Sequence, residues 1–342
     1  MLVVFARTPC TSNYVMKKER ETTDLLVVGA GPIGIACGVE ARRSGMPALV
    51  FDKGALTNAL CFYPPNLVWF STAELLEIGD IPLVCSGAKP TGPEVIHYYR
   101  RVAEHFKLDL RLYEGVEKIE PIRGGGFRVE SSRGRIVIAR GVVLATGFFD
   151  QPNLLGVAGE ELPKVKHYYD GPYVYYGQHV AVVGAGNSAV EVALDLYRSG
   201  AASVALIHRG TELAPGIKYW VRPDIENRIK EGSVRAFFET TVERIEEDTL
   251  TVRGANGEST SLKNDFVLAM TGYHADFDFI RRVGVNVDPE TLKPELDPET
   301  METNVPGMYC AGVIVGGRDS NKIFIENSRI HAKKIVAHAL RR

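Results

Sequence analysis

Two glycine-rich segments, about one domain apart, have the residue types and the spacing that bind a dinucleotide. They are Gly29-Ala30-Gly31-Pro32-Ile33-Gly34 and Gly184-Ala185-Gly186-Asn187-Ser188-Ala189, and an apolar run precedes each. The run predicts a buried strand, and the first glycine allows a tight turn. The second glycine lets the backbone approach a pyrophosphate, and the third small residue lets the following helix pack on the strand. The N-terminus of that helix offers free N–H groups to the anion. One such segment is a weak indication, but the pair predicts a protein that binds two dinucleotides.

The strand that follows each segment indicates which dinucleotide binds where. The first ends at Asp52-Lys53, and an acid at this distance binds ribose hydroxyls. The second ends at His208-Arg209 and carries no acid. A carboxylate would repel a 2′-phosphate, whereas a guanidinium binds one with two hydrogen bonds. We therefore expect FAD at the first segment and NADPH at the second. The alternative for His208 and Arg209 is a solvated strand end.

Each segment opens a longer module, and the two modules end alike. Their last strands finish at Ala145-Thr146-Gly147 and Met270-Thr271-Gly272. This repeat predicts an α/β fold with two Rossmann-like domains, the FAD-binding domain being interrupted by an inserted NADPH-binding domain. The expected division is a disordered tail at 1–22, FAD domain at 23–152 and 274–342, and NADPH domain at 153–273. The crossings near 151–155 and 273–277 are the expected hinges.

Several other elements follow from local signals. We expect a helix capped by Ser71, a helix over 93–106, a strand over 110–116 and a C-terminal helix over 322–340. The helices after the two glycine segments should each end at a glycine in the C′ position, namely Gly45 and Gly200.

Composition excludes several kinds of partner. The chain has 342 residues and a net charge of −2, so neither nucleic acid nor a membrane is an expected partner. Its five cysteines are scattered and odd in number, which favours a reducing cytoplasm over a secreted disulfide scaffold. The eight histidines are dispersed, and no metal site or Ser-His-Asp triad is predicted. A homo-oligomer is compatible with this composition.

Longer stretches give a family resemblance over residues 22 to 340. They are Phe62-Tyr-Pro-Pro-Asn66, Phe70-Ser-Thr-Ala-Glu-Leu-Leu-Glu-Ile-Gly79, Gly216-Ile-Lys-Tyr-Trp220, Met270-Thr-Gly-Tyr273 and Lys322-Ile-Phe-Ile-Glu-Asn327. The chain resembles the flavoproteins that include thioredoxin reductase, and within them it is most similar to the bacillithiol-disulfide reductase family. The resemblance implies a cytoplasmic FAD enzyme that uses NADPH to reduce the disulfide of a low-molecular-weight thiol.

The chain departs from these relatives at three places. Thioredoxin reductases carry a Cys-x-x-Cys pair where this chain has residues 167–172, which contain no cysteine. Members of the bacillithiol group often have a cysteine at the position of Ile33. Val313 stands where an aspartate usually binds the ribityl chain, so backbone N–H groups at Gly312, Val313 and the start of the Lys322 helix should contact the flavin.

These departures leave open which cysteine, if any, is the redox-active thiol. Cys61 precedes the Tyr-Pro-Pro loop expected to border the flavin, and it is the candidate catalytic residue. Cys37 lies one helical turn beyond Ile33, too far along the helix for direct attack, and is expected to be a packing residue.

The residues and the resemblance together predict two cofactor sites. For FAD they are Gly29, Gly31, Pro32, Ile33, Gly34, Asp52, Lys53, Ser71, Val116, Ala145, Thr146, Gly147, Gly312, Val313, Lys322, Ile323 and Phe324. For NADPH they are Gly184, Gly186, Asn187, Ser188, Ala189, Glu191, His208, Arg209, Thr271 and Gly272.

Four functional classes remain open at this point. The first is reduction of a small-molecule disulfide or of a small redox protein. The second is electron transfer to ferredoxin or flavodoxin without a thiol relay, which the missing cysteine pair allows. The third is a flavin monooxygenase, suggested by residues 159–169, and the fourth is a nucleotide-binding sensor without catalysis.

Overall fold

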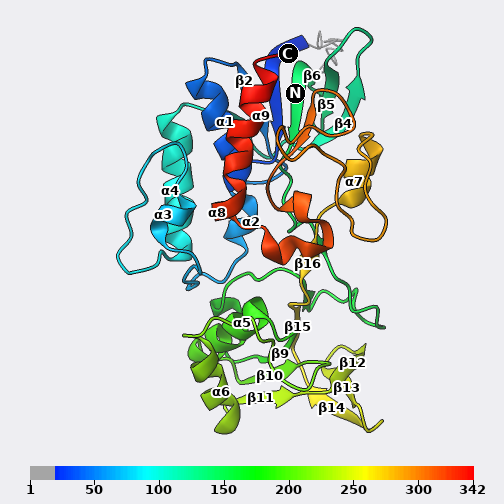
Figure 1. The fold of residues 1–342 in the computed structure, drawn as a ribbon. Helices are drawn as coiled ribbons and strands as arrows, with labels where there is room; N and C mark the ends of the chain where they lie inside the picture. Colours follow the sequence, from blue (N-terminus) through cyan, green and yellow to red (C-terminus); the bar gives the residue numbers. More distant parts are fainter. Residues whose placement is uncertain (1–19) are drawn as a thin grey trace, which may run out of the picture.

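Two runs of buried apolar residues form the central strands of two separate parallel sheets. The computed structural model describes residues 20–342, in which β1 (Arg20–Val28) and β9 (His179–Val183) each run into a glycine turn and a helix. The helices are α1 (Pro32–Arg43) and α5 (Asn187–Arg198). The predicted repeat is therefore present, once in a first lobe and once in a second lobe, shown above and below in Figure 1.

The first lobe is built on a seven-stranded sheet in the order β3-β2-β1-β6-β5-β4, with β17 as a further neighbour of β6. Its strands besides β1 are β2 (Ala48–Phe51), β3 (Asp109–Arg111), β4 (Val116–Pro121), β5 (Phe127–Ser131), β6 (Ile136–Leu144) and β17 (Met308–Cys310). Strand β6 pairs antiparallel with β5 near its start and parallel with β17 near its end. The last strand of the chain thus joins the sheet that the first strand began.

Helices cover both faces of this sheet, because alternate residues of β1 point to opposite sides. Leu25 and Val27 pack into the layer of α1, α4 and α9, while Leu26 and Val28 pack toward α7. The helical segments of the lobe besides α1 are α2 (Asn58–Cys61), α3 (Ala73–Leu76), α4 (Gly92–His105), α7 (Phe277–Arg282), α8 (Ile325–Ser328), α9 (Ile330–Ala339) and the kinked 3₁₀ segment η2 (Gly312–Lys322).

The second lobe repeats the plan with a five-stranded parallel sheet in the order β11-β10-β9-β15-β8. Val180 and Val182 face the helical layer, and Ala181 and Val183 face a three-stranded antiparallel sheet, β12-β13-β14. The elements besides β9 and α5 are β8 (Val165–Lys166), η1 (Tyr173–Tyr175), β10 (Ser203–Ile207), α6 (Arg222–Lys230), β11 (Val234–Phe237), β12 (Thr240–Ile245), β13 (Thr249–Gly254), β14 (Ser259–Lys263) and β15 (Phe266–Ala269).

The chain crosses between the lobes at two neighbouring segments. These are β7 (Gln151–Pro152) and β16 (Tyr273–His274), which pair with each other in an antiparallel ribbon. They fall within the crossings predicted from the sequence, and Figure 1 shows β16 between the lobes. Hinge motion at this ribbon stays a prediction.

Local chain signals predicted some elements well. The helix expected over 93–106 is α4, held by a capping box between Thr91 and Glu94. Both expected C′ glycines have positive φ, +72° at Gly45 and +83° at Gly200. No helix within residues 20–342 is both long and apolar enough to cross a membrane.

Other local predictions were wrong. The expected tail at 1–22 is too long, because residues 20–22 belong to β1 and pair with residues 136–138 of β6. The remainder of the tail and Cys10 lie outside the described residues. A single strand over 110–116 is also wrong, because the chain turns at Tyr113 (φ +52°) between β3 and β4.

Two expected helix starts are displaced. Ser71 does not cap a helix, since α3 begins at Ala73 and the Ser71 hydroxyl donates to Glu326 on α8 instead. The C-terminal helix does not begin at Lys322, which ends η2; α8 begins at Ile325 and α9 follows it. Lys322 is exposed and pairs with Asp319.

Candidate functional site

In both glycine segments the first glycine is tightly packed, whereas the middle glycine faces open space. A Cβ on Gly29 would lie 2.3 Å from the Ala145 carbonyl oxygen, and one on Gly184 would lie 2.4 Å from that of Met270. Both glycines also have positive φ, +109° and +135°. A Cβ on Gly31 or Gly186, by contrast, would meet no atom within 4 Å. The middle glycine of each segment therefore faces open space, as close approach of a pyrophosphate to the backbone requires.

The third small residue packs helix against strand, as predicted. A Cβ at Gly34 would lie 1.8 Å from the Gly29 carbonyl oxygen, which excludes any larger residue. In the second segment, Ala189 is fully buried at the equivalent place.

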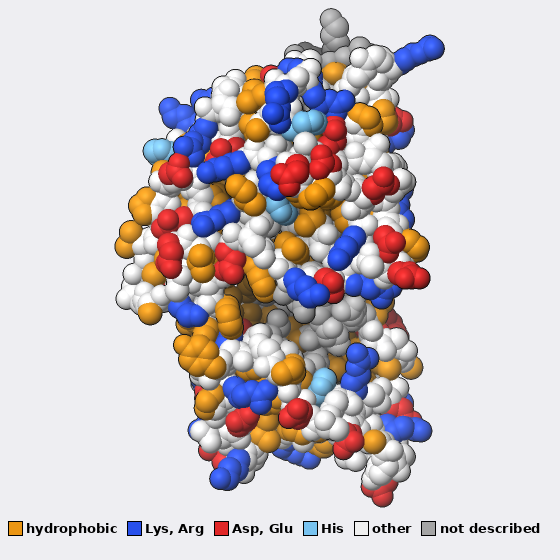
Figure 2. All heavy atoms as spheres, viewed as in Figure 1, with side chains coloured by type: hydrophobic (Ala, Val, Ile, Leu, Met, Phe, Trp, Pro, Cys, Tyr) orange, Lys and Arg blue, Asp and Glu red, His pale blue; other side chains and the backbone are white. Residues whose placement is uncertain are grey.

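Both segments open into one cavity of about 1690 Å³ between the lobes. Sites for a single small molecule are typically about 300–1,000 Å³, so this cavity has room for more than one ligand. Figure 2 shows the surface hollowed where the lobes meet, with apolar side chains at its rim. Every residue predicted for FAD or NADPH lines the cavity except Gly34, Ala189 and Lys322. The first two of these serve packing, and the third points elsewhere.

Asp52 links the first glycine turn to the strand β2. Its Oδ2 accepts the Ala30 N–H at 2.7 Å and its Oδ1 accepts the Gly54 N–H at 2.8 Å. Burial raises the pKa of this carboxyl, and the two backbone hydrogen bonds partly oppose that shift. Its neighbour Lys53 forms an ion pair with Asp150, with Nζ and Oδ1 2.7 Å apart. The acid therefore lies at the expected place beside the turn.

Two buried polar atoms of the cavity wall lack protein partners. Neither the Thr146 hydroxyl nor the Trp69 indole nitrogen has a hydrogen-bond partner within residues 20–342, and both residues line the cavity. Because such atoms are costly to bury alone, their presence fits a polar cofactor that would satisfy them.

The backbone contacts proposed near Gly312 need correction. Its N–H, expected to contact the flavin, donates instead to Nδ1 of His331 at 3.2 Å. Burial lowers the pKa of His331 to about 4, so the ring is neutral and accepts this hydrogen bond. Val313, Ile323 and Phe324 still line the cavity.

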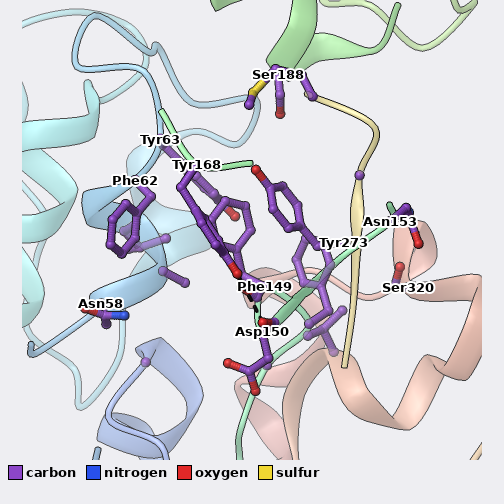
Figure 3. A pocket seen from close by; sticks show the side chains of 18 of the residues that line it. Asn58, Phe62, Tyr63, Phe149, Asp150, Asn153, Tyr168, Ser188, Tyr273 and Ser320 are labelled. Carbon is purple, nitrogen blue, oxygen red and sulfur yellow. Dashed lines mark hydrogen bonds between the residues drawn. The ribbon is translucent and has the colours of Figure 1, made fainter. Parts of the chain in front are cut away.

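An aromatic wall, Tyr63, Phe149, Tyr168 and Tyr273, stands where the lobes meet (Figure 3). The ring centroids of Phe149 and Tyr273 are 3.9 Å apart, and those of Tyr168 and Tyr273 are 5.4 Å apart. The Tyr168 hydroxyl donates to the Phe149 and Asp150 carbonyl groups. Sequence reasoning missed this wall, because its four residues come from four separate segments.

Glu191 on α5, a residue predicted for NADPH, forms an ion pair with Lys218 that sequence reasoning missed. Lys218 Nζ lies 2.6 Å from Glu191 Oε1, and both residues line the cavity. The Asn187 side chain holds the loop of Lys218, since it accepts the Lys218 N–H and donates to the Gly216 carbonyl group, each at 2.9 Å. Lys218 belongs to the stretch 216–220 quoted for the family resemblance, and that resemblance was the signal in the sequence that could have pointed to it.

His208 and Arg209 lie at the end of β10, as predicted, and line the cavity. Burial first, and then the Arg209 charge, lowers the pKa of His208. Arg209 is exposed at the edge of the cavity, and its binding of a phosphate there stays a prediction.

No cysteine within residues 20–342 lines the cavity. Cys61 is exposed and its Sγ donates to the Thr57 carbonyl group at 3.8 Å, although its neighbours Leu60 and Phe62 line the wall. Cys37 and Cys310 are buried in the core, which raises the pKa of each to about 12. The same residues hold no cluster of three or more metal-binding side chains. Cys61, the candidate catalytic residue, is therefore outside the cavity lining.

Comparison with known proteins agrees with this geometry. The family model for pyridine nucleotide-disulphide oxidoreductases matches residues 26–312. Bacilliredoxin reductase Bdr of Bacillus subtilis is 39% identical over 93% of this chain and 97% of its own. The structure of bacillithiol disulfide reductase Bdr (YpdA) from Bacillus cereus has a TM-score of 0.88 and 39% identity, covering 94% of this chain and all of that one.

A more distant structure shows the fold alone. Thioredoxin reductase of T. acidophilum has a TM-score of 0.75 at 20% identity, over 94% of this chain and all of that one. The chain thus belongs to the pyridine nucleotide-disulphide oxidoreductase family and is an NADPH-dependent FAD flavoprotein with a thioredoxin-reductase-like fold.

Proposed function

We propose that this enzyme reduces the disulfide of a low-molecular-weight thiol of the bacillithiol type. NADPH, a proton and one disulfide give NADP⁺ and two thiols, so two electrons are balanced. One observation carries the proposal: both glycine segments open into one cavity, in a chain 39% identical to a bacillithiol disulfide reductase. The similar Bacillus cereus structure is named for bacillithiol disulfide, and the Bacillus subtilis relative for bacilliredoxin.

The cavity residues divide between the two cofactors in this proposal. The first glycine segment, Asp52 and the Thr146 hydroxyl hold FAD, while the second segment with His208 and Arg209 holds NADPH. When bound, the cofactors supply the hydride chemistry, from nicotinamide to flavin to disulfide. With both cofactors bound, the aromatic wall would limit water at the junction of the two lobes. No protein thiol takes part.

We also propose the division into an FAD-binding part up to residue 152 and from residue 274 onward, with an NADPH-binding part at 153–273. The free thiols of the described residues suit a reducing cytoplasm. Electron transfer to ferredoxin is the less supported alternative, because the relatives at 39% identity are named for bacilliredoxin and for bacillithiol disulfide.

NADPH oxidation by the purified FAD-loaded protein tests the proposal. We expect turnover with bacillithiol disulfide, and with a bacilliredoxin–bacillithiol mixed disulfide if a protein acceptor is used, but not with ferredoxin. Turnover with ferredoxin and none with either disulfide would refute the assignment. A protein that binds no FAD would refute it as well.

A further inference from the structure

Residues of the loop at 66–70 contact the second lobe across the lobe boundary, and four of the residues involved belong to stretches quoted for the family resemblance. From the first lobe come Asn66, Val68 and Phe70, which lie in one loop after α2. From the second lobe come Asp195 on α5 and the pair Lys218 and Trp220. We call the set of interactions between them the inter-lobe contact. Asn66 Nδ2 donates to Asp195 Oδ1 at 2.8 Å, and Lys218 Nζ donates to the Val68 carbonyl oxygen at 2.7 Å. The ring centroids of Phe70 and Trp220 are 5.9 Å apart.

The charged members of this contact are buried and paired. Asp195 is 4% exposed and Lys218 is 5% exposed. The second oxygen of Asp195 accepts the Tyr169 hydroxyl at 2.9 Å, and Lys218 forms its ion pair with Glu191. Burial lowers the pKa of Lys218 and raises that of Glu191, and the ion pair opposes both shifts. Such buried charges hold a fixed geometry only while their partners are in place.

Lys218 has one donor left. An ammonium group has three N–H donors, and Glu191 and Val68 accept two of them. No third acceptor within residues 20–342 contacts this ammonium, which borders the cavity beside the second glycine segment. Asn187 of the second glycine segment accepts the Lys218 backbone N–H at 2.9 Å, so a phosphate held at that segment is the candidate acceptor for the third donor.

We propose that Lys218 is a positioning residue that binds a phosphate of NADPH while it holds the second lobe against the first. This rests on NADPH occupying the second glycine segment, as in the proposed function. The same ammonium would donate to the phosphate, to Glu191 and to the Val68 carbonyl oxygen, so an acceptor that fixes its position for one of them fixes it for the others. Nucleotide binding and the inter-lobe contact therefore reinforce each other. Because coupling is reciprocal, weakening the contact from the far side must weaken nucleotide binding.

Binding of NADP⁺ to the FAD-loaded protein, measured by calorimetry without any disulfide, is the first test. Lys218→Met should lower the affinity roughly ten- to hundredfold, as expected for lost hydrogen bonds to a charged group. Lys218→Arg should restore part of it. Asn66 is exposed and does not line the cavity, yet Asn66→Ala should lower the NADP⁺ affinity about fivefold through the coupling.

A matched control and a second readout separate coupling from general damage. Lys164 is a half-buried lysine of the second lobe that donates to three carbonyl groups, but it does not line the cavity. Lys164→Met should leave NADP⁺ affinity unchanged. In the wild type, NADP⁺ should slow hydrogen exchange of the backbone at 66–70, and Lys218→Met should abolish that effect.

Two results would overturn the inference: unchanged exchange at 66–70 on adding NADP⁺, or wild-type NADP⁺ affinity in Asn66→Ala. If the exchange response is present in a protein that reduces no disulfide, Lys218 keeps its role and the proposed acceptor is wrong.

Discussion

Some side chains of this enzyme are proposed to contact the cofactors, and others pack to form the cavity between the lobes. Arg209 belongs to the first kind, since it is exposed at the cavity edge after β10. We proposed that the Arg209 guanidinium binds the 2′-phosphate of NADPH, the one group by which NADPH differs from NADH.

Arg209→Ala should therefore weaken NADPH binding tenfold or more, roughly the value of a charge-assisted pair, and leave NADH binding unchanged. The measurement is a pair of titrations with the two nucleotides. Arg244→Ala is the matched control, because Arg244 is exposed in the same lobe, pairs with Glu246 and does not line the cavity. Equal losses for NADPH and NADH would contradict the assignment of the 2′-phosphate.

The first glycine turn offers a contrast between two single methyl groups. Gly31 has φ −74° and open space around it, so Gly31→Ala should unfold at nearly the wild-type temperature but lose bound FAD. Gly34→Ala should instead cost roughly 1–3 kcal/mol or more of folding free energy, because its Cβ meets the Gly29 carbonyl oxygen. Flavin content and thermal unfolding of the apoproteins check both. A Gly31→Ala protein that keeps its flavin would show that the turn does not hold the pyrophosphate.

At the scale of elements, α9 supports the segment η2 through one neutral imidazole. His331 accepts the Gly312 N–H, and burial holds its pKa near 4 against an ordinary value of 6.5. Below pH 6.5 the unfolded chain takes up a proton that the folded chain refuses, so this group lowers stability as the pH falls toward 4.

His331→Asn keeps an acceptor for Gly312 and removes the titration. The variant should lose less stability than the wild type between pH 6.5 and 4, while the two should change in parallel above pH 7. Denaturant unfolding at a series of pH values measures the difference. Parallel curves throughout the acidic range would mean that His331 is not buried neutral in solution.

The elements also show which features could be predicted from the sequence and which could not. The glycine turns and the C′ glycines follow from local backbone requirements, and the structure has them where they were predicted. Asp52 and Arg209 line the cavity, and their roles toward the cofactors stay predictions. The aromatic wall and the pair of Lys218 with Glu191 depend on segments brought together only by the fold. The error at Ser71 has the same origin, because the hydroxyl that would cap α3 meets Glu326 from the far end of the chain.

For the whole molecule, the positions of the cysteines carry the main consequence for mechanism. A variant with Cys10, Cys37, Cys61, Cys85 and Cys310 all replaced by alanine should keep disulfide turnover within about threefold, less than about 1 kcal/mol of activation free energy. Stopped-flow measurement of flavin reoxidation by the disulfide checks this. Restoring Cys61 alone and recovering a lost activity would instead establish a thiol relay.

The shared strand β6 has a consequence for how the protein is made. Its end pairs with β17, which leaves the ribosome only after the whole intervening lobe has been translated. We expect the second lobe to fold first, while the first waits with an unpaired sheet edge exposed to aggregation. Pulse proteolysis of ribosome-bound chains stalled before Met308 would show a resistant fragment from the middle of the protein, and a resistant amino-terminal fragment would rule this order out.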